Sequence, residues 1–332
     1  MIVVGVDENG LGPLLGPLVT TAVSFELARY SPERHASVGR ELGIDDSKAT
    51  AGFGQMAVAE GLALALVEAL YGQVVDDLDA LFDCLLLDAP STLRTPCPSS
   101  SRPQCWSVPL VLPCFGGSLE AGRDMLRGLT KAGLRPVHAR SATSCTGDLN
   151  RRLRLGQSRV EVDLELMERL VLDARARTDL LSRAQGRASA GALRAVCGMV
   201  GGIRNYPARM RHFPLAGLTP VRANGGTLAY EVDGVGHVRF EIDADARHLP
   251  VALASMVGKY VRELWMERQN RFYRGHDDTL SDVSGYHDPV TARFVAASAP
   301  LRLALAIDDA CFLRKNARNI VEQAHDTQLP LL

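Results

Sequence analysis

The most constraining feature of this chain is an apolar run at its start that ends in two adjacent carboxylates. Residues 2–6 predict a buried strand, and Asp7 and Glu8 follow it directly. Glycines and prolines within residues 10–17 predict a turn, and a second apolar run, residues 18–25, follows at hairpin distance. Acidic side chains are costly to bury without a compensating cation. The stretch therefore predicts either a metal site with oxygen ligands or a turn whose carboxylates face water.

Side chains alternate between the two faces of a strand, so Asp7 and Glu8 would point in opposite directions if the strand were unbroken. They can converge only if the strand breaks between them or just after them. The glycines that begin with Gly10 supply such a break, and they also allow a backbone or a ligand to approach closely.

Length and composition limit the class of protein. With 332 residues, 46% hydrophobic and 23% charged, the chain can bury a sizeable core and is typical of a soluble globular protein. The formal net charge of −1 creates no global basic field, so a nucleic-acid partner would need a local basic surface. We see no signal-peptide pattern and no apolar run long enough to cross a bilayer. We therefore expect a cytoplasmic protein without a membrane partner, and we expect it to be a monomer.

The seven cysteines are widely spread, and most fall in or near the less regular residues 73–147. A zinc site is conceivable, but the wide spacings and the lack of a Cys-x-x-Cys pair favour scattered core thiols. The cysteines of this part of the chain are Cys84, Cys97, Cys105, Cys114 and Cys145.

Hydrophobic periodicity predicts an alternation of helices and strands. Helices are predicted over residues 54–71, 160–177, 249–273, 290–297 and 301–313, and strands over residues 193–197, 228–232 and 238–242. The Asp233-Gly234 pair between the last two strands is a strong hairpin signal. Early strands followed by helices and further strand–helix alternation predict an α/β domain with a mixed sheet.

The middle of the chain is expected to be an elaboration inserted into a smaller fold, because it is rich in proline and serine around residues 96–103. We expect residues 1–72 and 151–298 to form one domain, residues 73–150 to be the insertion, and residues 299–332 to be a C-terminal helical extension. A basic cluster near the end of the insertion is either a solvated loop or a phosphate-contacting patch. Its members are Arg151, Arg152, Arg154 and Arg159.

Four short motifs follow one another along the chain. The first is Asp7-Glu8-Asn9-Gly10-Leu11-Gly12-Pro13 with Gly16-Pro17, and the second is Asp46-Ser47-Lys48. The third runs from Asp245 through Ala254-Ser255 to Lys259 and Arg262-Glu263, and the fourth is Gly285-Tyr286. In this order they resemble the motifs of the type 2 ribonucleases H, ribonuclease HII in particular. The resemblance covers about residues 1–50 and 190–297 and leaves the middle of the chain uncovered.

The resemblance implies a ribonuclease H-like mixed sheet flanked by helices. It also implies an endoribonuclease that hydrolyses the RNA strand of RNA–DNA hybrids by a two-metal in-line mechanism with Mg²⁺ or Mn²⁺. Carried over by motif, Asp7, Glu8 and Asp245 would be catalytic metal ligands. The substrate-binding residues implied in the same way are Gly10, Leu11, Gly12, Lys48, Lys259 and Tyr286.

The chain departs from the family pattern in three places. The family has a further catalytic Asp at the end of a strand where this chain has Gly198, and Asp243 is one candidate to replace it. Leu11 stands where ribonuclease HII usually has Arg, which leaves incision at single ribonucleotides in DNA open. Glu263 replaces an Asp and keeps its charge.

Two other functions are left open, and Gly198 motivates the first of them. One is a catalytically weakened homologue that binds hybrid or junction nucleic acid without efficient cleavage. The other is a different metal-dependent phosphoesterase on the same fold.

Overall fold

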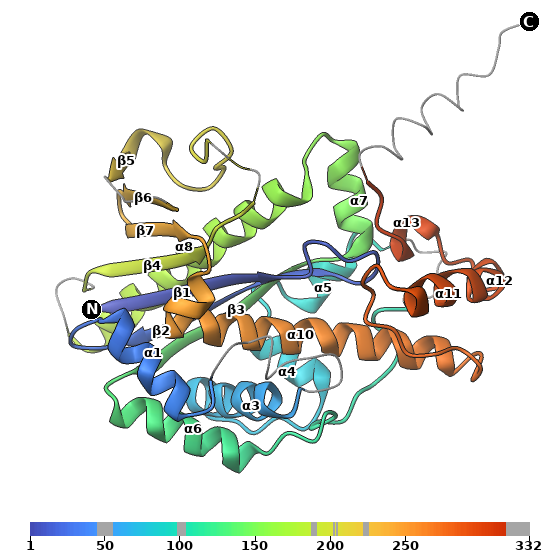
Figure 1. Cartoon of the computed structure of the whole chain (residues 1–332), viewed down its shortest axis with the longest axis horizontal. Coiled ribbons are helices and arrows are strands. Elements are labelled where there is room, and N and C mark those ends of the chain that lie inside the picture. Colours follow the sequence, from blue (N-terminus) through green and yellow to red (C-terminus); the bar gives the residue numbers. More distant parts are fainter. Residues whose placement is uncertain are drawn as a thin grey trace, which may run out of the picture.

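The computed structural model describes residues 1–44, 56–97, 104–186, 191–201, 203, 205–221 and 226–316. Within them a seven-stranded mixed sheet has the order β3-β2-β1-β4-β7-β6-β5 (Figure 1). The strands are β1 (Ile2–Asn9), β2 (Leu18–Glu26), β3 (Arg135–Ser144), β4 (Leu193–Gly198), β5 (Leu218–Val221), β6 (Thr227–Val232) and β7 (Gly236–Glu241). The turn that holds Lys48 lies outside the described residues, so the assignment of Lys48 stays a prediction.

Strand β1 is an interior strand of the sheet, between β2 and β4. It pairs antiparallel with β2, with Val6 opposite Ala22, and parallel with β4, with Val6 opposite Cys197. The predicted opening hairpin and the hairpin of β6 and β7 are both confirmed. An antiparallel hairpin beside parallel β1, β4 and β7 gives the mixed sheet that the sequence predicts.

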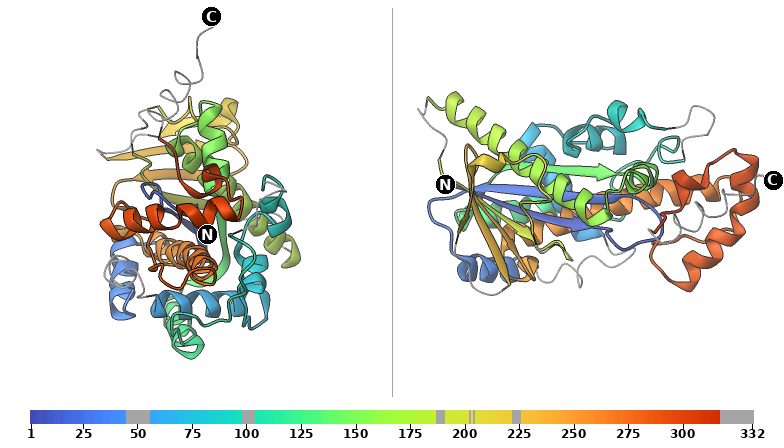
Figure 2. Two further views of the ribbon diagram at one scale, coloured as in Figure 1. Left: turned by 90° about the vertical axis from the view of Figure 1, so that its right-hand side faces the viewer. Right: turned by 90° about the horizontal axis from the view of Figure 1, so that it is seen from above.

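Helices cover both faces of the sheet (Figures 1 and 2). They are α1 (Pro32–Glu41), α3 (Ala57–Tyr71), α4 (Leu78–Leu85), α5 (Pro90–Arg94), α6 (Leu119–Lys131), α7 (Thr146–Arg154), α8 (Arg159–Ala184), α9 (Ala244–Arg247), α10 (Leu249–Arg274), α11 (Pro289–Ala297), α12 (Ala299–Ala304) and α13 (Asp309–Phe312). No helix of the described residues is both long enough and apolar enough to cross a membrane.

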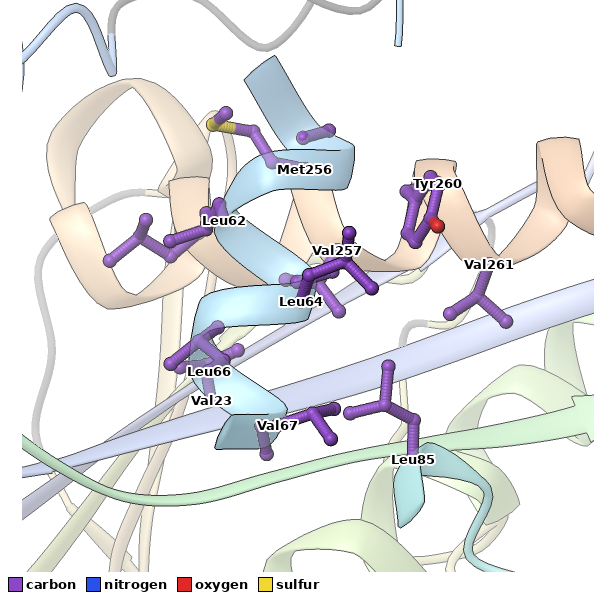
Figure 3. Close-up of a cluster of buried hydrophobic side chains, with 14 of the residues drawn as sticks. Val23, Leu62, Leu64, Leu66, Val67, Leu85, Met256, Val257, Tyr260 and Val261 are labelled. Carbon is purple, nitrogen blue, oxygen red and sulfur yellow. The ribbon is translucent and has the colours of Figure 1, made fainter. Parts of the chain in front are cut away.

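One face of the sheet packs against α10 and α3. Val23 of β2, Leu66 of α3 and Val257 of α10 belong to the same buried core, part of which Figure 3 shows. Helix α10 lies close to the sheet because β1 has no side chain at Gly5. A Cβ on Gly5 would lie 2.1 Å from the carbonyl carbon of Pro250. This contact sets the position of the α10 N-terminus relative to β1.

The opposite face packs against α8. Ile2, Val4 and Val6 of β1 share a second core with apolar residues of this helix. The start of α8 is fixed by a capping box, in which Ser158 and Glu161 each bond the backbone of the other. Helices α11 to α13 gather at the end of the molecule opposite the N-terminus, around a third core that includes Phe294 and Phe312 (Figure 2).

The expected insertion over residues 73–150 needs a correction. Its last part, Arg135–Ser144, is β3, which pairs with β2 along the whole strand and belongs to the central sheet. Residues 151–154 are likewise the end of helix α7 and not a loop. Strand β3 does not show a clear alternation of apolar and polar residues, because α8 and α3 bury both of its faces. The other boundaries stay predictions.

Candidate active site

The candidate site lies where β1 runs past the end of β4. Strand β1 continues through Asn9, so of the two predicted places for a break, between Asp7 and Glu8 or just after them, the strand ends at the second. The two side chains nevertheless meet at one place, because the neighbouring strand β4 stops at Gly198. A Cβ on Gly198 would lie 2.8 Å from Oδ1 of Asp7 and 3.5 Å from Oε2 of Glu8. The shortness of β4 therefore opens the space that both carboxylates reach.

Asp245 is brought to the same place from a distant part of the chain. It lies in the short helix α9, just after β7, and is half-buried. Its charge acts on both of the β1 carboxylates and raises the pKa of each. Asp245 is therefore close enough to Asp7 and Glu8 for their charges to interact, and the assignment of the three carboxylates as one site stays a prediction.

Asp243 does not join this group as the sequence suggested. Asp243 would share a face with Asp245 only if the strand predicted over residues 238–242 continued that far, but β7 ends at Glu241. Asp243 instead precedes α9 in the left-handed conformation, with φ of 51°, and its side chain is exposed. Because the chain turns before Asp243, strand alternation no longer aligns it with Asp245.

A fourth carboxylate, Asp163, was missed by the sequence reasoning. It lies on α8, is fully buried, and accepts a hydrogen bond of 2.9 Å from the Thr20 hydroxyl. Its Oδ2 has no hydrogen-bond partner among the described residues. The sequence does contain a feature that could have identified Asp163, because this residue stands one turn before Met167 on the apolar face of the helix. A charged residue on such a stripe is an anomaly that marks a buried polar site.

These carboxylates raise one another's pKa values. Burial raises the pKa of Asp7 above its ordinary range, Glu8 raises it further, and the Ser255 hydroxyl that bonds Asp7 opposes the rise. Burial and then the charge of Asp163 raise the pKa of Glu8 to about 8. Burial raises the pKa of Asp163 to about 7, with a further contribution from Asp7. Buried like charges of this kind create a demand for a cation.

We expect this repulsion to show in the pH dependence of stability. A carboxyl with a raised pKa in the fold stabilises the protein while protonated, and the contribution disappears as the pH rises toward the folded pKa. This loss of stability is expected between about pH 4, the pKa of a carboxyl in the unfolded chain, and the pKa in the fold, which is about 8 for Glu8 and about 7 for Asp163. In EDTA, the free energy of unfolding measured by urea denaturation should fall by on the order of 2–4 kcal/mol across this pH range. Mn²⁺ should reduce the fall, and an unchanged profile with and without Mn²⁺ would contradict the expectation.

The glycine turn lies beside the carboxylates and is held by the Gly285 segment. The backbone N–H groups of Leu14 and Leu15 donate to the carbonyl of Gly285, at 2.8 and 3.0 Å. Gly10 has a φ of 86°, which favours glycine, and a Cβ there would lie 2.7 Å from Nε of Arg262. Gly12 is exposed, with nothing within 4 Å of the position of its absent Cβ. Its backbone is therefore open to a ligand.

Tyr286 and Arg262 form a second part of this surface. The Arg262 guanidinium lies 4.9 Å from the centre of the Tyr286 ring and donates to the carbonyl of Ser284. Tyr286 itself is 45% exposed, so its ring is accessible. Lys259 lies one helical turn beyond Ser255 and on the same side of α10. Arg262 therefore lies beside both Gly10 and Tyr286, two residues of the predicted substrate set.

Two further arginines shape the glycine turn. Arg314, which is buried, donates to the carbonyls of Gly10 and Gly16. Arg159 extends toward the carbonyls of Leu11 and Pro13, at 3.5 Å each. The sequence placed Arg159 in a basic cluster but did not connect it to the turn. No motif pointed to Arg314, which lies near the end of the described chain and reaches the turn only through the tertiary fold.

Two other arginines of that cluster, Arg151 and Arg152, are engaged by acidic side chains. Arg151 pairs with Asp148, and Arg152 bonds both Asp148, at 2.8 Å, and Glu165, at 3.0 Å. Their charges are largely compensated, and contact with phosphate stays a prediction.

Comparisons with known proteins agree with the motifs. A ribonuclease HII of Gluconobacter oxydans (strain 621H) is 30% identical over 112 residues, which are 29% of this chain and 54% of that protein. A ribonuclease HII of Methanothermobacter thermautotrophicus is 46% identical over 48 residues, 14% of this chain and 20% of that protein. The matched region thus spans about half of one relative and a fifth of the other. No protein-family model matches the chain.

Solved structures of the same class also resemble the chain. Ribonuclease HII of Archaeoglobus fulgidus, solved in a complex with PCNA, is 15% identical over 95% of both chains with a TM-score of 0.42. Ribonuclease H2 of Pyrococcus horikoshii OT3 is 15% identical over 98% of this chain and 99% of that one, also with a TM-score of 0.42. At these values the structural likeness carries no argument about activity or partners.

The mixed sheet, with β1 between an antiparallel hairpin and parallel β4, gives the chain a ribonuclease H-like α/β fold. Over part of its length the chain is similar in sequence to the two ribonucleases HII.

Proposed function

We propose that this protein is a divalent-metal-dependent ribonuclease H that hydrolyses the RNA strand of RNA–DNA hybrids. The observation that carries the proposal is a group of carboxylates with raised pKa values: Asp7 and Glu8 face the space beside Gly198, and the charge of Asp245 raises the pKa of both. The two ribonuclease HII relatives support the same reaction class.

The residues at the site fit a hard divalent cation. All the candidate ligands are carboxylate oxygens, which suit Mg²⁺ and Mn²⁺. The unpartnered Oδ2 of Asp163 and the raised pKa values of Asp7 and Glu8 indicate an excess of buried negative charge. Among the described residues, no three such groups already stand close enough to hold an ion, as expected for carboxylates that repel one another.

In the proposed enzyme, Asp7, Glu8 and Asp245 hold two Mg²⁺ or Mn²⁺ ions. Such a pair would activate a water molecule for in-line attack and stabilise the leaving oxygen. The Ser255 hydroxyl orients the Asp7 carboxylate toward that space. The exposed backbone at Gly12 allows the nucleic-acid strand to approach closely.

Tyr286 would provide an aromatic surface next to the scissile strand, with Arg262 behind it. Lys259 and Lys48 would contact phosphates as point charges, and Gly10 and Leu11 complete the substrate-binding turn. The Leu11 side chain cannot donate a hydrogen bond. Any recognition of the 2′-hydroxyl, which distinguishes RNA from DNA, must therefore come from the backbone or other side chains.

We propose that Asp163 supplies negative charge that Gly198 does not. It approaches the site from α8, and its charge is the largest one acting on Glu8. We expect Asp163→Asn to lower the rate of hybrid cleavage by about 10–100-fold, the usual range for residues that support metal ligands. Asp179→Asn on the same helix, an ion-paired carboxylate away from the site, is the matched control. Equal rates for Asp163→Asn and the unmodified protein would exclude this role.

The function is tested with end-labelled substrates of about 20 base pairs, which is roughly two helical turns. The four substrates are an RNA–DNA hybrid, a DNA duplex, an RNA duplex and a DNA duplex with one ribonucleotide. Each is incubated with EDTA, Mg²⁺ or Mn²⁺. We expect nicks in the RNA strand of the hybrid, only with the metals. The fourth substrate shows whether Leu11 excludes cleavage at a single ribonucleotide. Hybrid binding without metal-stimulated cleavage would instead identify a weakened homologue, and preferential cleavage of plain DNA or RNA would identify a different phosphoesterase.

A further inference from the structure

Arg314 bonds both ends of the glycine turn, residues 10–17. Its guanidinium donates to the carbonyls of Gly10 and Gly16, the second at 2.8 Å. Its backbone N–H donates to the carbonyl of Leu14, at 2.9 Å. Arg314 follows α13, which Figure 1 shows beside the loop between β1 and β2. The C-terminal segment therefore fixes the backbone of a turn that lies near the start of the sequence.

Arg159 holds the middle of the same turn. It is the first residue of α8, and its Nη1 lies 3.5 Å from the carbonyl oxygens of Leu11 and Pro13. Its Nη2 donates to the carbonyl of Lys315, at 3.0 Å. A positive charge at the N-terminus of a helix is unfavourable, because it faces the positive end of the helix dipole. The carbonyls of the turn and of the C-terminal segment stabilise the guanidinium there.

The two guanidinium groups carry positive charge that no carboxylate of the described residues neutralises. Arg314 is 2% exposed, and its Nη2 has no hydrogen-bond partner in the described part of the chain. Burial lowers the pKa of Arg314, and the charges of Arg262 and Arg159 lower it further. Burial also lowers the pKa of Arg159. Uncompensated positive charge behind the turn favours an anion on its open side.

The bonded carbonyls also fix the direction of the peptide N–H groups in the turn. The peptide bonds here are trans, so each N–H points away from the carbonyl of the preceding residue. Because the carbonyls of Gly10 and Leu11 face the two arginines, the N–H groups of Leu11 and Gly12 point away from them. Neither N–H is bonded to a described residue, and Gly12 is exposed. Successive free N–H groups of this kind bind anions such as phosphate.

We propose that Arg314 and Arg159 are positioning residues for nucleic-acid binding, which hold the glycine turn so that two of its N–H groups meet a phosphate of the bound strand. The inference rests on the proposed function, since the phosphate belongs to the hybrid. Arg314 is too buried to reach the strand itself and acts through the turn. The C-terminal segment is thereby part of the substrate-binding apparatus.

The first test is hybrid affinity, measured in EDTA by fluorescence anisotropy over a range of salt concentrations. Arg314→Lys keeps the charge, but its ammonium cannot reproduce the planar contact with Gly10 and Gly16. We expect a dissociation constant about 10-fold higher, roughly the effect of one lost hydrogen bond to a charged group. The slope of affinity against salt should not change, because no cation in contact with phosphate is removed. The single-turnover cleavage rate with Mn²⁺ at saturating enzyme should also be unchanged.

Arg159→Met should weaken hybrid binding as well, and Arg175→Met is its matched control. Arg175 lies about four turns further along α8, where it bonds Asp179. Hybrid affinity should be unchanged in this control. Equal affinity of Arg314→Lys and the unmodified protein would overturn the proposal. A salt slope that falls by about one in Arg314→Lys would also overturn it, because Arg314 would then contact phosphate directly.

A second measurement uses only the unmodified protein. In EDTA, hydrogen exchange at Leu11 and Gly12 should be faster than at Leu14 and Leu15, whose N–H groups donate to Gly285. Bound hybrid should slow the exchange of the first pair. Unchanged exchange on hybrid binding would overturn the inference, and so would a failure to bind the hybrid at all. Binding with the expected exchange but no cleavage with metal would reject the proposed hydrolysis and support the inference about the turn.

Discussion

Asp7→Asn should lower the rate of metal-dependent hybrid cleavage on the order of 10³-fold or more, because it removes a carboxylate from the centre of the proposed metal site. The side chain keeps its size and can still accept the hydrogen bond from Ser255. The loss should therefore lie in the chemical step, visible as a lower single-turnover rate at saturating enzyme, with little change in hybrid affinity.

The thermal stability of Asp7→Asn shows whether a lower cleavage rate is caused by misfolding. Asn removes a buried charge that Glu8 and Asp245 repel, so thermal unfolding in EDTA near pH 8 should occur at the same or a higher temperature. Asp124→Asn on α6, an exposed carboxylate, should leave both the rate and the unfolding temperature unchanged. If Asp7→Asn cleaved the hybrid as fast as the unmodified protein, Asp7 would not be a metal ligand.

Gly5→Ala should be the most damaging small substitution in the sheet. The new Cβ would lie 2.1–2.3 Å from backbone atoms of Pro250 and Val251, and neither backbone can rotate away as a side chain could. Helix α10 would have to move off β1, and we expect a loss of about 3 kcal/mol or more in the free energy of unfolding, measured by urea denaturation. Since Ser255 and the preceding α9 move with α10, hybrid cleavage should fall as well.

The matched control is Gly201→Ala, where nothing lies within 4 Å of the added Cβ and φ is not positive. Its stability should stay within about 0.5 kcal/mol of the unmodified protein. If Gly5→Ala were equally mild, the close contact between β1 and α10 would not be what positions Ser255 beside Asp7.

The local patterns of the chain were enough to predict much of the fold. The apolar run before Asp7 and the turn residues after it predicted β1 and β2 because strand formation and hairpin turns depend on neighbouring residues. Helix α10 was predicted almost to its ends from its periodicity and from Pro250 in the first turn. Asp7 and Glu8 were noticed because they end an apolar run, whereas the role of Asp245 came from the resemblance to the type 2 ribonucleases H.

Strand pairing was harder to predict. Residues 135–144 were assigned to an insertion because nothing local tells an edge strand of the main sheet from a strand of an added unit. Pairing with β2 is a long-range contact, and only the folded chain shows it. The same limit applied to Asp243, whose expected alignment with Asp245 depended on where β7 ends.

The sequence thus determined which elements form and which motifs carry acidic residues, because periodicity, turn chemistry and charge act over a few residues. The tertiary structure alone decided that β4 ends beside Asp7 and that Asp163 of α8 is buried close enough to Glu8 to raise its pKa. These arrangements depend on how β1, α8 and α10 pack. Packing is the sum of many weak, non-directional contacts between residues distant in sequence, and no single stretch of the chain encodes it.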